Sequence, residues 1–282
     1  MPKFRVVTDS TVDVTPEEIE KYGITIVPLS VLIDGALHQD GNESEKEAFL
    51  EKMKASKVLP KSSQPPAGLY VEKYEALTAD GSEVLSIHVT HTLSGTVDCA
   101  RQAADIANGN ITVVDSAFCA RAMAFQVLEA AKCAQEGLSI AETLPRLDAV
   151  RNRTVQYIAI ANLENIVKGG RIGKTMGAVT TLLNIKVNLQ MIEGKLEMDA
   201  KGRGLKAIVK RYETILDSLK ENNQEVASIG ITHVGMAEYA ETILENIQTA
   251  YPDADTRMAY ASASVMTHAG LEAVSVQFLL KD

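Results

Sequence analysis

Two patterns of apolar residues, one typical of strands and one typical of helices, alternate along the first half of the chain. Short β-rich apolar runs, at Phe4–Thr8, Val84–Val89 and Ile111–Val114, are separated by longer segments with helical spacing. The segment Thr15–Glu18 has the pattern of a capping box, with proline at the first helical position, and predicts a helix to about Tyr22. This alternation of strands and helices predicts a parallel sheet covered by helices on both faces.

Turn and breaker residues divide the same half further. Asp34-Gly35 predicts a hairpin. Ser44 and Glu47 predict a second capping box, for a helix that ends near Ala55. Pro145 is expected to kink or split a helix at Ser139–Arg151. The other helices predicted in this half cover Pro66–Ala79, Leu93–Ala107 and Phe118–Gln135.

The pattern changes after about residue 153. Glu193-Gly194 joins two β-rich segments and predicts a hairpin of Lys186–Ile192 with Lys195–Asp199. An amphipathic helix follows, with one apolar face made by Leu205, Ile208, Val209, Tyr212, Ile215, Leu216 and Leu219. The remaining predicted elements are strands at Ala227–Thr232, Arg257–Ala261 and Val274–Leu280 and a helix at Ala237–Tyr251. We therefore expect an α/β protein of two domains: a parallel-sheet α/β domain at 1–152 and an α+β domain with a mixed sheet at 153–282.

Composition and charge narrow the classes of function. The chain has 282 residues, 46% of them apolar, and a net charge of −9, which argues against nucleic acid or an anionic membrane surface as the main partner. No apolar run approaches the roughly 20 residues of a membrane span, so no integral membrane association is expected. The first residues read directly into a strand without the pattern of a signal peptide. The 3 cysteines have no metal-site spacing and are expected to be buried reduced thiols, in keeping with a cytoplasmic location. No cofactor and no metal are predicted.

The segment LENIVKGGRIGKT, residues 163–175, resembles a phosphate-binding loop but fails its spacing. The Walker A pattern requires a glycine at position 168, where this chain has Lys168. Residues 163–168 read instead as a short helix, which Gly169-Gly170 would end. The sequence therefore argues against a nucleotide site here.

Hydroxyl side chains cluster after the predicted strands of the first half. They occur at Asp9–Thr11, Ser62–Pro65, Thr90–Thr96 and Asp115-Ser116, and most of these segments lead into helices. Such loops meet at the carboxyl ends of parallel strands, where hydroxyls and helix N-termini suit a carboxylate or phosphate. Each loop alone could be only a helix cap.

Catalytic motifs are weaker than this binding pattern. Ser94 stands in Leu-Ser-Gly and not in a G-x-S-x-G nucleophile elbow. The residues alone favour a binding protein. A serine-dependent hydrolase of lipid or acyl esters, with Ser94 as nucleophile and His91 or His268 as base, is the alternative.

Several motifs, taken in order, resemble the DegV family over essentially the whole chain. They are VVTDSTVDV (6–14), LPKSSQPPAGLY (59–70), THTLSGTVDCA (90–100), VVDS (113–116), NLENIVKGGRIG (162–173), LLNIKVNLQ (182–190) and VMTHAGLEA (265–273). The resemblance implies a two-domain carrier, not an enzyme. It implies that a long-chain fatty acid such as palmitate, stearate or oleate lies in a tunnel between the domains. It also implies a partner, the catalytic subunit of a fatty acid kinase, which makes the acyl phosphate.

The resemblance also implies roles for five residues. Ser62, Ser94 and His268 match the positions that hold the carboxylate, with Ser62 standing where threonine is usual. Arg171 and Arg203 match arginines at the pocket mouth that are implicated in docking the kinase, and both positions suit an exposed side chain.

One segment departs from the family pattern. Ala269–Ala273 replaces the usual T-G-P-G-A, so that Leu271 and Glu272 stand in place of proline and the second glycine. This departure brings the local backbone shape into question.

Overall fold

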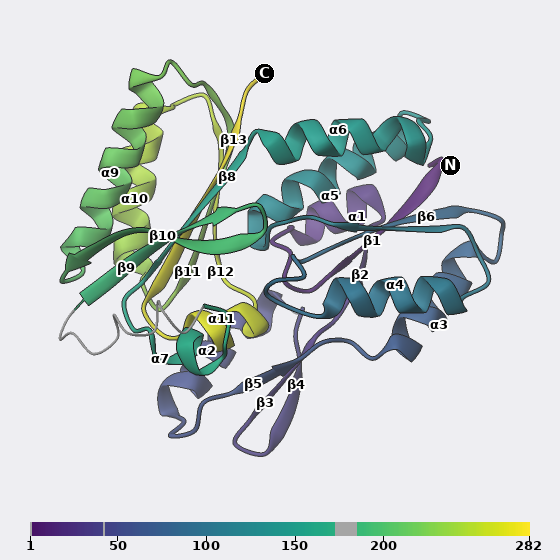
Figure 1. Cartoon of the computed structure of the whole chain (residues 1–282), viewed down its shortest axis with the longest axis horizontal. Helices are drawn as coiled ribbons and strands as arrows, with labels where there is room; N and C mark the ends of the chain where they lie inside the picture. Colours follow the sequence, from purple (N-terminus) through teal and green to yellow (C-terminus); the bar gives the residue numbers. More distant parts are fainter. Residues whose placement is uncertain (1, 42, 173–184) are drawn as a thin grey trace.

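The computed structural model describes residues 2–41, 43–172 and 185–282, which form an α/β protein with three β-sheets (Figure 1). The first sheet is parallel throughout, in the order β2-β1-β6-β7. Its strands are β1 (Phe4–Asp9), β2 (Thr25–Val27), β6 (Glu83–His88) and β7 (Ile111–Asp115). The predicted parallel sheet is confirmed.

Helices cover both faces of the parallel sheet because its strands are apolar on both sides. On one face α5 packs against Phe4, Leu85 and Ile87; on the other, α3 and α4 pack against Val7 and Val84. The helices of this part are α1 (Pro16–Tyr22), α3 (Ala67–Thr78), α4 (Thr96–Ile106), α5 (Ala120–Gln135) and α6 (Ile140–Asn152).

The second sheet is mixed, in the order β10-β9-β8-β13-β11-β12, with only its β11–β12 pair parallel. Its strands are β8 (Thr154–Ile160), β9 (Ile185–Ile192), β10 (Lys195–Arg203), β11 (Val226–Val234), β12 (Asp255–Tyr260) and β13 (Ala273–Leu280). One face is covered by α9 (Lys206–Glu221) and α10 (Ala237–Ala250), as the predicted amphipathic helix requires. The opposite face looks toward the parallel sheet (Figure 1).

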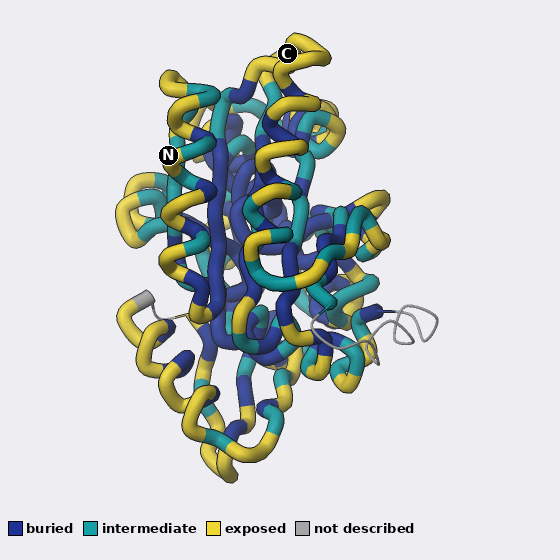
Figure 2. Tube along the Cα trace, turned by 90° about the vertical axis from the view of Figure 1, so that its left-hand side faces the viewer, coloured by how far each residue is buried: buried dark blue, intermediate teal, exposed yellow. Residues whose placement is uncertain are grey.

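A third, three-stranded sheet lies below the two large ones (Figure 1). Its strands β3 (Ser30–Ile33), β4 (Ala36–Gln39) and β5 (Lys61–Ser63) are antiparallel. Around it lie the short helices η1 (Glu43–Glu45), α2 (Lys46–Ala55), α7 (Glu164–Lys168) and α11 (Ala263–Ala269). One apolar cluster joins Val31 and Phe49 to Leu189 and Met266, so this early segment packs on the later part of the chain. Figure 2 shows the central strands buried and the outer turns of the helices exposed.

Three details differ from the sequence-based expectations. The N-cap residue of α2 is Glu45, which makes no side-chain cap bond, because a 3-10 turn precedes the helix. The capping box predicted at Ser44 is therefore wrong. α6 continues through Pro145 as one helix, since the proline removes only one backbone donor and a capping box at Ser139 holds its start. α4 begins at Thr96, three residues after the predicted Leu93. The sequence did not predict β5 or α11.

Among the described residues, no helix has the length and apolar character that crossing a bilayer requires. In the same residues, no group of His, Cys, Asp and Glu side chains is arranged to hold a metal ion.

Candidate functional site

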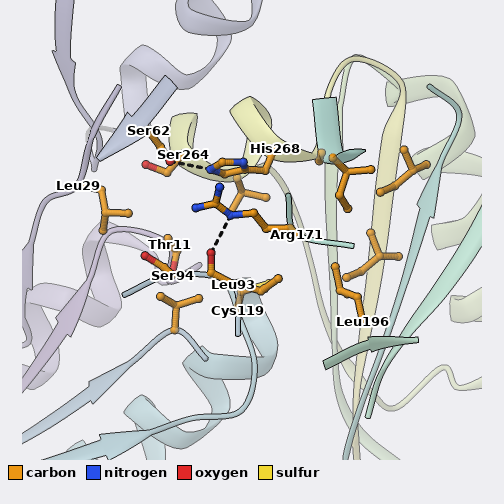
Figure 3. Close-up of a pocket in the computed structure, with 16 residues that line it drawn as sticks. Thr11, Leu29, Ser62, Leu93, Ser94, Cys119, Arg171, Leu196, Ser264 and His268 are labelled. Carbon is orange, nitrogen blue, oxygen red and sulfur yellow. Dashed lines mark hydrogen bonds between the residues drawn. The ribbon is translucent and has the colours of Figure 1, made fainter. Parts of the chain in front are cut away.

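A cavity lies between the two large sheets (Figure 3). Most of its wall is apolar, and β8, β10, α7 and the loops after β6 contribute to it. Its apolar residues include Val89, Leu93, Ile158, Ile160, Ile166 and Leu196. An apolar lining with a few polar groups is typical of a small-molecule site.

A second, smaller chamber lies beside the first. The two share Cys119, Ile158, Val265 and Ala269 as walls. Burial raises the pKa of the Cys119 thiol to about 11, so this sulfur is an inert part of the wall. All three cysteines are free and buried, as the sequence predicted. Together the chambers offer an elongated apolar space.

Polar groups gather at one end of the first chamber. They are Thr11, Ser62, Ser94, Arg171, Ser264 and His268 (Figure 3). Thr11 and Ser94 follow β1 and β6, Ser62 lies in β5, and Ser264 and His268 lie four residues apart on α11. The structure therefore brings Ser62, Ser94 and His268 to one cavity. The Asp115-Ser116 loop does not join them: Ser116 donates to Phe118 O, and Asp115 pairs with His91.

Ser62 and His268 are in direct contact, with 2.6 Å between Ser62 Oγ and His268 Nε2. Either group donates, depending on the imidazole tautomer. Burial, aided by the nearby charge of Arg171, lowers the pKa of His268 to about 4, so the ring is neutral at neutral pH. Its Nδ1 has no hydrogen-bond partner among the described residues.

The hydroxyls of Ser94 and Thr11 differ in what they can donate. Ser94 Oγ lies 2.8 Å from Thr96 Oγ1, and either atom can be the donor, so the Ser94 hydrogen is available to the cavity when Thr96 donates. Thr11 Oγ1 donates to Asp9 Oδ1 at 2.6 Å. Thr11 is therefore committed and can only accept from a ligand. Ser94 also precedes α4, whose Gly95 N-cap provides no side-chain cap for the first N–H groups.

Arg171 lies inside this site and not at an exposed mouth. Its half-buried guanidinium donates from Nε to Leu93 O at 2.9 Å and from Nη1 to Gly169 O at 2.5 Å. Burial lowers the pKa of Arg171, but a guanidinium remains charged at any pH a protein meets. The expectation of exposure is wrong for Arg171, because the turn after α7 directs the side chain inward (Figure 3). It holds for Arg203, which ends β10 and does not line the cavity.

The hydrolase alternative can be tested on these contacts. Ser94, its predicted nucleophile, bonds to Thr96, while His91 is exposed and paired with Asp115 and His268 contacts Ser62. Ser62 and His268 do form a serine–histidine pair, but no third group orients His268 among the described residues. Within the described part of the chain, the pair therefore has no orienting member of the kind that nucleophilic catalysis requires.

Two features noted in the sequence, the glycines at 169–170 and the departure at Glu272, lie in segments next to the site. α7 ends at Lys168 with Gly169 as its C-cap, and Gly170 follows with φ of 74°, so the predicted glycine stop is confirmed. The Gly173-Lys174-Thr175 end of the phosphate-loop-like pattern lies outside the described residues. After α11, Glu272 has φ of 63°. The backbone therefore keeps a left-handed conformation that favours glycine, although Glu272 stands there.

Ser264 is a cavity residue that sequence reasoning missed. Thr11 was identified only as part of the hydroxyl-rich segment Asp9–Thr11. No sequence pattern indicated that Ser264 lines the cavity or that the Arg171 side chain points inward.

Residues 3–281 match the family described as an uncharacterised protein of the DegV family. A DegV domain-containing protein from Streptococcus pneumoniae is 43% identical over 276 residues, covering 98% of this chain and 98% of that protein. The structure of DegV from Bacillus subtilis, described as a fatty acid binding protein, has a TM-score of 0.89 at 27% identity and covers 100% of both chains.

The Streptococcus pneumoniae Fatty Acid Kinase (Fak) B3 protein, solved loaded with linoleic acid, has a TM-score of 0.85 at 23% identity. That comparison covers 99% of this chain and 100% of the other, and it concerns the fold. Since the family match extends over nearly all residues and a relative at 43% identity is matched end to end, this chain belongs to the DegV family.

Proposed function

We propose that this protein binds one long-chain fatty acid, with the tail in the elongated cavity and the carboxylate at Ser62, Ser94 and His268. The observation that carries the proposal is an apolar space with hydroxyls, a neutral imidazole and a guanidinium at one end only. Palmitate, stearate and oleate have this polarity. The two domains, 1–152 and 153–282, would enclose the ligand between their sheets.

The head-group end can satisfy a carboxylate with defined donors. If His268 donates through Nε2 to Ser62 Oγ, the Ser62 hydrogen is directed to the ligand. If Thr96 donates to Ser94 Oγ, the Ser94 hydrogen is free in the same way. Arg171 supplies the positive charge that a half-buried carboxylate needs, since an unpaired buried charge is very costly.

The tail supplies most of the affinity. Burial of about 15 methylenes at ~0.8 kcal/mol each contributes about 12 kcal/mol before ordering costs. The polar groups then need only fix the head group in place and select for it.

We further propose that the protein is a cytoplasmic carrier that presents the fatty acid to the catalytic subunit of a separate kinase, which forms the acyl phosphate. The Fak B3 likeness and the family resemblance support this role. Arg203, exposed at the end of β10, would contact the kinase, whereas Arg171 would face the head group. A guanidinium suits a carboxylate or phosphate because it binds both with two parallel hydrogen bonds.

The test is the ligand itself. Protein purified from its host and denatured should release one fatty acid per chain, identified by mass spectrometry. Protein without fatty acid that also fails to bind added palmitate or oleate would refute the proposal. The competing hydrolase, now centred on the Ser62–His268 contact, predicts turnover of an acyl ester that Ser62→Ala abolishes; we expect no turnover.

A further inference from the structure

Asp40 is a buried carboxylate that touches the framework of the site but does not line the cavity. It follows β4, and its side chain is 4% exposed. Asp40 Oδ1 accepts the backbone N–H of Ala263 at 2.9 Å, and Oδ2 accepts that of Ser264 at 3.1 Å. Both oxygens therefore bind the first turn of α11.

These two bonds join the two elements that hold the serine–histidine contact. Asp40 continues from the three-stranded sheet, in which β3 pairs with β5 and sets Val31 opposite Ser62. α11 carries His268 one turn further along and packs against β3 and β5. Ser62 and His268 are 206 positions apart in sequence, so only tertiary contacts of this kind can set their 2.6 Å separation.

Asp40 completes the N-terminal cap of α11 from a distant segment of the chain. Ser262 is already the N-cap residue of α11, and its hydroxyl accepts from Val265 N. Burial raises the pKa of Asp40, although hydrogen bonds from Ser264, Ala263 and Ser262 oppose this. Ser262 satisfies only the N–H of Val265, so the N–H groups of Ala263 and Ser264 depend on a buried carboxylate from the segment after β4.

We propose that Asp40 is the positioning residue of the head-group site: by binding Ala263 and Ser264, it holds α11 against the three-stranded sheet and so sets His268 against Ser62. This inference rests on the proposed fatty-acid function. The expected effect of losing Asp40 is selective for the head group of the ligand. Loss of Asp40 disturbs recognition of the carboxylate, while the apolar chambers, to which Asp40 contributes no wall, keep their hold on the tail.

The experiment compares two ligands of equal chain length, palmitate and hexadecanol, by titration against the full-length protein. Asp40→Asn keeps the side-chain size but loses one of the two acceptors. We expect palmitate affinity to fall about tenfold, the size of one hydrogen bond to a charged group, while hexadecanol affinity stays within about twofold. Asp34→Asn is the matched control, because Asp34 lies on the same hairpin, accepts from Ser56 and does not reach α11.

A second variant approaches the same bond from the helix. Ala263→Pro deletes the N–H that Asp40 Oδ1 accepts and places a ring carbon there. Ala263 is the first helical residue, a position that proline suits, and Ser262 before it is extended with ψ of 156°. This variant should keep α11 and still lose the preference for palmitate, which matters if Asp40→Asn does not fold.

The outcomes separate the two ideas. Equal weakening of both ligands in Asp40→Asn would make Asp40 a support of the whole cavity and overturn the positioning role. Unchanged palmitate affinity in both variants would overturn it as well. Failure of the parent protein to bind either ligand would instead refute the proposed function.

Discussion

Two serine–histidine contacts in this protein have similar geometry and opposite settings. In the parallel sheet, Ser86 Oγ lies 2.7 Å from His88 Nε2, and His88 Nδ1 lies 3.0 Å from Asp9 Oδ2. All three side chains are completely buried. In the cavity, Ser62 and His268 are 2.6 Å apart, but His268 Nδ1 has no partner among the described residues.

The contrast shows that a complete triad arrangement does not by itself make a reactive site. The core network has no access to a solute, and Tyr74 adds a further bond to Ser86 Oγ. Asp9 also accepts from Thr11 and Val89, so the network fixes the strand ends that border the cavity. The cavity pair lines a space that a ligand can enter, although the unpaired Nδ1 of His268 is itself buried. Access for a ligand distinguishes the proposed binding site from the scaffold.

The strongest way to test this contrast is to break the core network with Asp9→Ala. The change leaves His88 and the Thr11 and Val89 amides without a buried partner, and should cost about 3–5 kcal/mol of unfolding free energy. Denaturant titration measures the loss. The control is His91→Ala, which breaks an exposed pair with Asp115 and should cost at most about 1 kcal/mol. A loss below that value in Asp9→Ala would show that the network is dispensable.

Substitutions at the cavity should have the opposite effect: they should weaken fatty-acid binding and leave the free energy of unfolding nearly unchanged. Ser94→Ala should weaken fatty-acid binding by about 1.5–3 kcal/mol, the range for a hydrogen bond to a charged group. Ser62→Ala and His268→Ala should also weaken it, and the effects should not add, because the three groups share one carboxylate. Titration of single and combined variants decides this. If all three single variants bind like the parent, the head group lies elsewhere.

The pH dependence of stability should expose the neutral state of His268. Its pKa is lowered from 6.5 to about 4, so between these values the unfolded chain takes up a proton that the folded protein does not. Stability from this group is therefore complete above pH 6.5 and declines as the pH falls toward 4. The difference in unfolding free energy between the parent and His268→Asn should shift across this window. A constant difference from pH 7 to 4 would contradict the assignment.

Arg171 and Arg203 test whether an arginine in the cavity and an arginine on the surface have different roles. Arg171→Ala should lower fatty-acid affinity by about tenfold, or ~1.4 kcal/mol, because Arg171 lines the cavity and its charge would face the proposed head group. Arg203→Ala should leave affinity unchanged, since this side chain is exposed outside the cavity, while acyl-phosphate formation with the kinase falls about tenfold. Ligand titration and the kinase assay are made on the same preparations. Parallel loss of binding in Arg203→Ala would place Arg203 in the pocket.

The smallest expected effect is a gain in stability without a change in binding. Glu272→Gly relieves the left-handed conformation that follows the helix of His268 and should stabilise the fold by about 1 kcal/mol. Glu272 is exposed, and its backbone bonds to Val234 and Ala161 need no side chain. Thermal unfolding with and without palmitate measures both effects. A loss of stability would mean that the glutamate side chain contributes more than its backbone strain costs.

Much of the fold could be predicted from the sequence because its long elements carry their own periodicity. The strands β1, β6 and β7, the Asp34-Gly35 and Glu193-Gly194 turns and the amphipathic helix α9 occur where local pattern placed them, and α4 begins three residues later than predicted. The sequence also identified Ser62, Ser94 and His268 as candidates, through hydroxyl-rich strand ends and family motifs. Their roles in binding remain predictions; their meeting at one cavity is a property of the structure.

Only the tertiary structure decided the elements that assemble that cavity. β5 has 3 residues and α11 has 7, too few for a periodic pattern or for independent stability, so they form because β3 and the neighbouring apolar cluster hold them. The inward turn of Arg171 depends on the carbonyls of Leu93 and Gly169, and the Ser62–His268 contact spans 206 positions. Local sequence determines elements that are stable through their own pattern. Contacts between distant segments determine the site, since each short segment acquires its conformation from its neighbours.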